Sequence, residues 1–172
     1  MKNLFVLIFT ISSLQLYSQS IPPQFLASFK QNKLEAKYQI KGYLKPLFLL
    51  GDFNGDGIND ISILVSEKRT QKKGMIVFFG NSTQYFIFGA GTKVGKIGSD
   101  ATDDLKWMER WEVFKGKVAY ETKFHDGDMV GSTKRRLSNK GISMWSLEDG
   151  EPSAGGIIYW NGKKWIWIHQ GE

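Results

Sequence analysis

The chain of 172 residues contains no cysteine and only two histidines, His125 and His169. Without cysteine there can be no disulfide framework, no thiol nucleophile and no attachment point for a lipoprotein lipid. No histidine pair has the spacing of a zinc site, and no GxSxG nucleophile motif is present. Aspartate and glutamate are numerous enough for a catalytic carboxylate pair, although nothing singles out two of them. We therefore expect a protein that is not an enzyme.

The N-terminus has the pattern of a secretory signal peptide. Lys2 supplies a short basic start, residues 4–14 are almost entirely apolar, and residues 16–20 are polar or small. The apolar stretch is too short to span a membrane. We expect residues 1–18 to be removed on export, leaving no transmembrane segment in the mature chain. Proline is scarce, and no Pro- or Ser-rich linker divides residues 19–172, which predicts one mostly β domain.

The formal net charge of the chain is +6, with basic runs at residues 67–73 and 134–136. A basic surface can attract nucleic acid or other polyanions. Export and the lack of a recognised nucleic-acid motif argue against nucleic acid as a partner. The runs are interpreted as solvated turns, with contact to an anionic glycan or an envelope protein as the alternative. The oligomeric state stays open.

Residues 51–60, with the sequence GDFNGDGIND, carry the clearest chemical signal. Relative to Asp52 as position 1, oxygen-bearing side chains stand at positions 1, 3, 5 and 9, and Gly57 stands at position 6. A hard cation such as Ca²⁺ takes six to eight oxygens, which this spacing gathers from a short turned segment. The expected ligands are Asp52, Asn54, Asp56, the carbonyl of Ile58, and Asp60. The alternative is a Gly/Asn/Asp-rich turn without an ion.

The loop is not typical of an EF-hand, because position 12 holds Ile63 in place of the bidentate glutamate. The segment GDFNGDGINDISIL instead resembles the calcium loop of FG-GAP and VCBS-type repeats, the blade units of integrin α-chain propellers. This resemblance implies a DxDxDGxxD calcium loop within a four-stranded blade, with Asn54 replacing one aspartate. The chain contains one such motif, whereas a propeller needs several blades.

Short strand-like segments dominate the rest of the chain. Four of them would make the blade-like unit, at residues 47–52, 61–67, 75–79 and 84–88. Residues 22–31 predict a short helix, and residues 111–114 and 118–124 predict a hairpin around the turn 115–117. The predicted fold class is therefore mainly β, with antiparallel sheets built around the four-stranded unit, C-terminal hairpins and a short N-terminal helix.

A last hairpin is predicted at Asn161-Gly162, a pair that favours a two-residue type I′ turn. This turn would pair Trp160 with Lys163 and Ile158 with Trp165. One face of the hairpin then carries Ile158, Trp160, Trp165 and Trp167, and the other carries Ile157, Tyr159, Ile166 and Ile168. Both faces are apolar, so at least one is core. We expect packing for the Trp160, Trp165 and Trp167 face, with a ligand surface for glycan or protein as the alternative.

Two functional hypotheses follow. The first is an exported, non-catalytic calcium-binding β domain that acts as a binding or structural module at the cell envelope or outside the cell. The second is a small secreted hydrolase that uses carboxylates and holds a structural calcium ion.

Overall fold

The computed structural model describes residues 20–94 and 102–171. The predicted signal peptide at residues 1–18 lies outside the described residues. The elements are α1 (Pro23–Gln31), η1 (Leu34–Ala36), β1 (Tyr38–Ile40), β2 (Phe48–Gly51), β3 (Asp60–Glu67), β4 (Lys73–Phe78), β5 (Tyr85–Gly89), β6 (Arg110–Phe114), β7 (Val118–His125), β8 (Asp128–Arg136), β9 (Gly141–Glu148), β10 (Glu151–Trp160) and β11 (Trp165–Gly171).

The first sheet is an antiparallel meander of β2, β3, β4 and β5, in chain order. β1 pairs with the far end of β3, on residues 65–67, while β2 pairs with residues 60–63. The two short strands thus share the length of one long strand. The second sheet has the order β11-β10-β9-β6, and β7 and β8 form a two-stranded sheet of their own.

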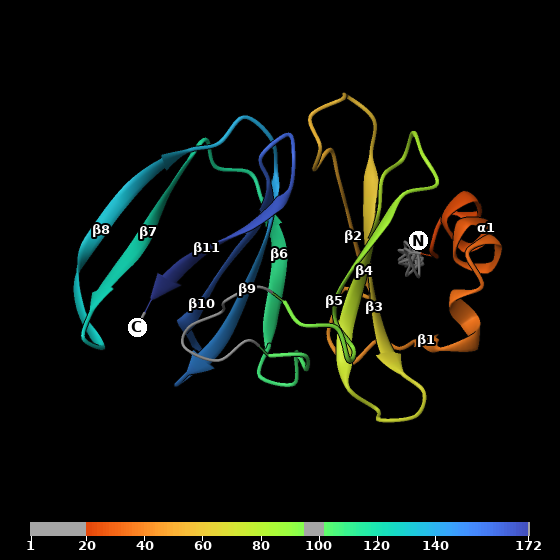
Figure 1. Ribbon diagram of the computed structural model, residues 1–172, viewed down its shortest axis with the longest axis horizontal. Coiled ribbons are helices and arrows are strands. Elements are labelled where there is room, and N and C mark those ends of the chain that lie inside the picture. Colours follow the sequence, from red (N-terminus) through yellow and green to blue (C-terminus); the bar gives the residue numbers. More distant parts are fainter. Residues whose placement is uncertain (1–19, 95–101, 172) are drawn as a thin grey trace, which may run out of the picture.

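These elements stack in layers, with α1 on one flank and the β7–β8 hairpin on the other (Figure 1). Between α1 and the first sheet lies an apolar cluster that includes Phe25, Phe29, Ile61 and Ile63. The main core fills the space between the two large sheets, and a smaller cluster lies between β7 and the outer face of the second sheet. Every residue of β3 is buried, because both faces of this strand are covered.

The structure confirms the predicted fold class, which is mainly β with several antiparallel sheets and a short helix near the N-terminus. No helix among the described residues is long and apolar enough to cross a membrane.

The hairpin predicted for residues 111–114 and 118–124 is wrong. β6 pairs with β9, and β7 pairs with β8. Trp111 on β6 is buried in the main core, and its indole Nε1 donates to the carbonyl of Pro46 at 2.9 Å. Ala119 on β7 packs instead in the cluster on the outer face of the same sheet. The two strands are therefore separated because β6 is an edge strand of the second sheet, whereas β7 lies over the outer face of that sheet.

The C-terminal hairpin forms, but its predicted register is wrong by two residues. Trp160 pairs with Trp165, and Ile158 pairs with Trp167. The turn spans four residues because the side-chain oxygen of Asn161 accepts from the backbone N–H groups of Lys163 and Lys164, at 3.0 and 2.9 Å. Side chains alternate with a period of two, so this shift leaves each side chain on its predicted face.

The tryptophan face of this hairpin is packed against the first sheet. The ring of Trp165 lies 5.5–6.0 Å, centroid to centroid, from the rings of Phe79, Phe86 and Phe88. Trp167 covers bare backbone, since a Cβ added at Gly156 would lie 2.6 Å from its Cζ2 atom. Packing is thus the role that these contacts support.

We expect Trp165→Ala to lower the free energy of unfolding by about 3 kcal/mol, because it empties a contact among three phenylalanines. Urea unfolding measures the loss. The matched control is Leu26→Ala, since Leu26 is 37% exposed and its removal should change stability much less. Equal stability of Trp165→Ala and the native chain would contradict the packing role.

Candidate metal centre

Residues 51–60 form a loop that connects β2 to β3 at one end of the first sheet. Gly51 and Asp60 pair across the two strands and close the loop at its base. The predicted arrangement of strand, loop and strand is therefore present. Phe53 is fully buried within the main core, so its side chain anchors the loop to the space between the sheets.

Asp60 is the buried anchor of the loop, with no exposed surface. Its Oδ2 accepts from the backbone N–H groups of Phe53 at 2.7 Å and Asn54 at 3.2 Å. Its Oδ1 accepts from the N–H of Gly80, in the β4–β5 turn, at 2.9 Å. Burial raises the pKa of Asp60 above its usual value. The three N–H donors oppose this shift, and the nearby charge of Asp56 adds to it.

Asp52 organises the outer part of the loop. Its Oδ1 accepts from the N–H groups of Gly55 at 2.6 Å and Asp56 at 3.1 Å, and its Oδ2 accepts from Gly57 at 2.9 Å. Gly55 and Gly57 have φ of +84° and +85°, a region that residues with a Cβ rarely adopt. The glycines therefore allow the turn in which successive N–H groups face one carboxylate.

Asp56 lies at the exposed tip and takes part in a second set of hydrogen bonds. Its Oδ1 accepts from the N–H of Ile58 at 2.7 Å, and its Oδ2 accepts from the side-chain amide of Asn54 at 2.8 Å. The Oδ1 of Asn54 in turn accepts from the N–H of Asp56 at 3.0 Å. Asn54 thus directs its amide nitrogen, rather than its oxygen, toward the nearest carboxylate.

The loop gathers three carboxylates without a basic partner. None of the ion pairs among the described residues includes Asp52, Asp56 or Asp60. Backbone and amide N–H groups supply all of the hydrogen bonds that these carboxylates accept within that part of the chain. The loop therefore carries a concentrated negative charge that a cation would neutralise.

The donor atoms suit calcium, but they do not form a finished cage. The loop offers carboxylate, amide and carbonyl oxygens, the ligand types that Ca²⁺ prefers. Within residues 20–94 and 102–171, however, no three His, Cys, Asp or Glu side chains converge as metal ligands. One oxygen of each carboxylate accepts a single N–H bond and so retains a lone pair for a metal, namely Oδ2 of Asp52, Oδ1 of Asp56 and Oδ1 of Asp60. Binding would chiefly require Asn54 to turn its amide oxygen inward and the carboxylates to draw together.

Two further asparagines contact the loop, and the spacing of the motif gave no signal for either. Asn81, in the β4–β5 turn, donates its side-chain amide to Asp56. Asn139, in the β8–β9 turn, packs against Gly55, and its side-chain amide donates to the carbonyl of Trp160 at 3.2 Å. The loop of the first sheet therefore also touches the second sheet.

The predicted ligand surface of Trp160, Trp165 and Trp167 is half-buried. A cavity of about 50 Å³ is bordered by Trp165 and Trp167, and their indole nitrogens have no hydrogen-bond partner among the described residues. Such a volume holds a water molecule or two and is too small for a sugar ring. We therefore do not assign a ligand to this face.

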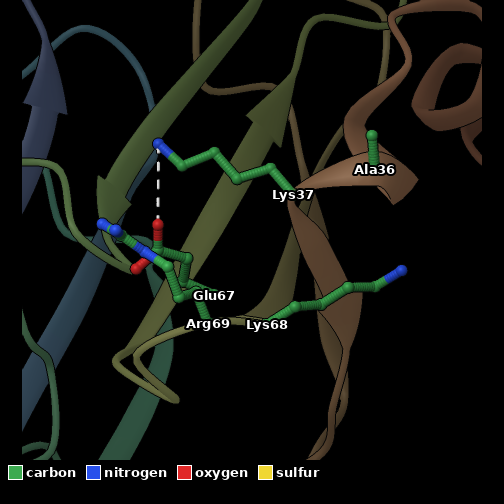
Figure 2. Close-up of a pocket in the computed structure, with 5 residues that line it drawn as sticks. All are labelled: Ala36, Lys37, Glu67, Lys68 and Arg69. Atoms are coloured by element: carbon green, nitrogen blue, oxygen red, sulfur yellow. Dashed lines mark ion pairs between the residues drawn. The ribbon is translucent and has the colours of Figure 1, made fainter.

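The basic run at residues 67–73 forms the β3–β4 turn and borders a surface hollow of about 430 Å³, lined by Ala36, Lys37, Glu67, Lys68 and Arg69 (Figure 2). Glu67 is buried and lies 3.9 Å from the ammonium group of Lys37. Lys68 points away from Glu67 and donates to the carbonyl of Glu35. Lys68 in the turn and Lys37 beside it are thus both engaged by the protein itself.

Among the described residues, side chains of the types used in catalysis gather at two exposed places. His125 and Asp126 lie 3.5 Å apart in the β7–β8 turn, and their side chains are 79% and 91% exposed. Two glutamates, Glu148 and Glu151, border one hollow at the β9–β10 turn, but both are exposed. A general acid of the glycosidase type needs a buried environment that keeps it protonated. This arrangement offers no support for the hydrolase hypothesis.

Comparison of the chain with protein-family models, with curated proteins and with solved structures finds no match. The resemblance to FG-GAP and VCBS-type repeats therefore stays a prediction from the motif.

We expect Asp60→Ala to cost about 3 kcal/mol or more of unfolding free energy even in the presence of a chelator, because three backbone N–H groups lose their acceptor. Asp60→Asn retains one acceptor oxygen and should cost less. Urea unfolding in EDTA measures both. A loss for Asp60→Ala no larger than that for Asp56→Ala under these conditions would contradict the anchoring role.

Proposed function

We propose that the protein is an exported, non-catalytic calcium-binding β domain that acts as a binding or structural module at the cell envelope or outside the cell. The observation that carries the proposal is the cluster of Asp52, Asp56 and Asp60 within one turn, without an ion-pair partner among the described residues. Carboxylates held together in this way repel one another, and a divalent cation removes that repulsion.

Asp52, Asn54, Asp56, Asp60 and the carbonyl of Ile58 would hold the ion, with water completing its six to eight oxygens. The chain's own contribution is orientation. Asp52 is held by three backbone N–H groups, and Asp60 is held by another three, so both carboxylates stay attached to the turn while they draw together around an ion. Calcium would supply positive charge at the centre of the loop.

A filled site would stiffen more than the loop. Its residues contact Asn81 at one end of the first sheet and Asn139 in the turn that leads into β9 of the second. A cation that orders the loop therefore strengthens a contact between the sheets. If free calcium is present at about ten times the Kd, mass action adds about 1.4 kcal/mol to stability. A chain without disulfides gains a substitute for them in this way.

Export is part of the proposal because it supplies the ion. Its support is the pattern of Lys2, the apolar residues 4–14 and the small residues that follow. Modules outside the cell bind calcium with a Kd of about 10⁻⁴–10⁻³ M. A site that becomes fully ordered only on binding is sufficient for such an affinity.

We expect millimolar Ca²⁺ to raise the melting temperature of the protein, and Mg²⁺ to raise it much less, because Mg²⁺ demands a rigid octahedral site. Asp56→Ala should remove the calcium increment and leave the melt in chelator nearly unchanged, since Asp56 is exposed. Glu151→Ala, which removes an equally exposed carboxylate elsewhere, should keep the increment. Differential scanning calorimetry measures all three. Identical melting in Ca²⁺ and in chelator would overturn calcium binding.

We expect the protein recovered from the envelope or medium of its producing cell to begin near Gln19. N-terminal sequencing measures this directly. A cytosolic pool with Met1 intact would overturn export, while the calorimetric result would still stand on its own.

A further inference from the structure

The β7–β8 hairpin presents a long strand edge, which is interrupted by one β-bulge at Val130, where the register with β7 shifts. β8 pairs only with β7 among the described strands, so its other edge is free. Eight of its nine residues are exposed, and Thr133 alone is half-buried. The hairpin forms the outermost layer on its flank of the molecule (Figure 1). A free edge of this length offers a row of unpaired N–H and C=O groups to another strand.

Apolar side chains gather on the same hairpin. Tyr120, Phe124, Met129 and Val130 are 45–59% exposed, and they make up four of the seven large hydrophobic residues that are exposed in the described chain. Scattered exposed apolar residues are normal, whereas a group of them on one element marks an interaction surface.

The order of charges along β8 identifies the partner. Asp128 begins the strand beside the turn residue Asp126, and Lys134, Arg135 and Arg136 end it. Arg135 is engaged by Glu121 of β7, with 2.6 Å between its Nε and the Oε2 of Glu121, which leaves Lys134 and Arg136 for another partner. One end of the edge is therefore acidic and the other end is basic.

We propose that β8 is a dimerisation edge at which a second copy of this chain adds its own β8 in antiparallel orientation. With the two-fold axis at Ser132, Asp128 of each copy lies opposite Arg136 of the other. The product is a four-stranded sheet of two hairpins, in which Met129 and Val130 of each copy lie opposite Arg135 and Lys134 of its partner. A two-fold interface is self-complementary, and an edge with opposite charges at its two ends meets that condition.

The same charge order argues against other occupants. An edge of uniformly positive charge would repel a second copy, which is how many proteins protect their edges. This edge repels itself only in parallel alignment and attracts itself in antiparallel alignment. An acidic strand from another protein would match the basic end and repel Asp128. The proposal is independent of calcium binding and of export.

The test uses two charge-reversed variants of the full chain. Asp128→Lys makes both ends of the edge basic, and the double change Lys134→Glu with Arg136→Glu makes both ends acidic. In sedimentation over a range of concentrations, the native chain should form dimers that weaken as salt is raised. Each variant alone should remain monomeric. An equimolar mixture of the two should dimerise again, because positions 128 and 136 that lie opposite each other are then of opposite charge.

The matched control is the double change Lys163→Glu with Lys164→Glu in the exposed β10–β11 turn, which alters the net charge as much as the double change on β8 does and should leave the native dimer intact. Unchanged melting temperatures would show that the variants are folded, as expected for exposed positions. A native chain that stays monomeric overturns the proposal. Dimers that survive in both variants, or a mixture that stays monomeric, overturn it equally, because another surface or another alignment would then be responsible.

Discussion

The central strand β3 is buried on both of its faces, and the arrangement of the other elements depends on this burial. One face of the first sheet carries Ile61, Ile63 and Val65 and is covered by α1. The opposite face carries Leu64 and is covered by the second sheet. Burying the apolar side chains of β3 on only one face would leave the other exposed to water at a cost of roughly 1.5–3 kcal/mol for each side chain. The short helix and the second sheet are both needed to avoid that cost.

Asp60 marks the point at which this buried strand becomes a loop. Its carboxylate is buried, and it satisfies backbone N–H groups that would otherwise lack a partner as the chain leaves the sheet. The loop is therefore built around an anion at its base. Asp52 and Asp56 add negative charge farther out, where solvent reaches them more easily. The carboxylates that shape the turn thus also give it the negative charge that attracts a cation. This links the backbone hydrogen bonds of the loop to the proposed function.

The strands of the first sheet and the face of each side chain in the last hairpin could be predicted from the sequence, because alternation and apolar runs report burial directly. Which strands pair with each other could not be predicted in the same way. The segments 111–114 and 118–124 are adjacent in sequence, yet Trp111 and Ala119 pack on opposite faces of one sheet. The turn at Asn161 is longer than predicted because the asparagine side chain accepts from two backbone N–H groups that follow it. The preference of the Asn-Gly pair for a two-residue turn does not take this side-chain contact into account.

The sequence by itself determined the mainly β fold class, the loop between two strands, the oxygen donors within it, and the absence of thiol chemistry. These properties depend on residue type and short spacing, which the chain carries locally. The tertiary structure alone decided that Asp60 is buried, that Asn81 and Asn139 contact the loop, that the tryptophans pack against phenylalanines, and that β8 ends with a free edge. Each of these features depends on contacts between segments that are far apart in the chain. Many strand pairings satisfy the same local pattern, and only the packing of whole layers decides which pairing forms.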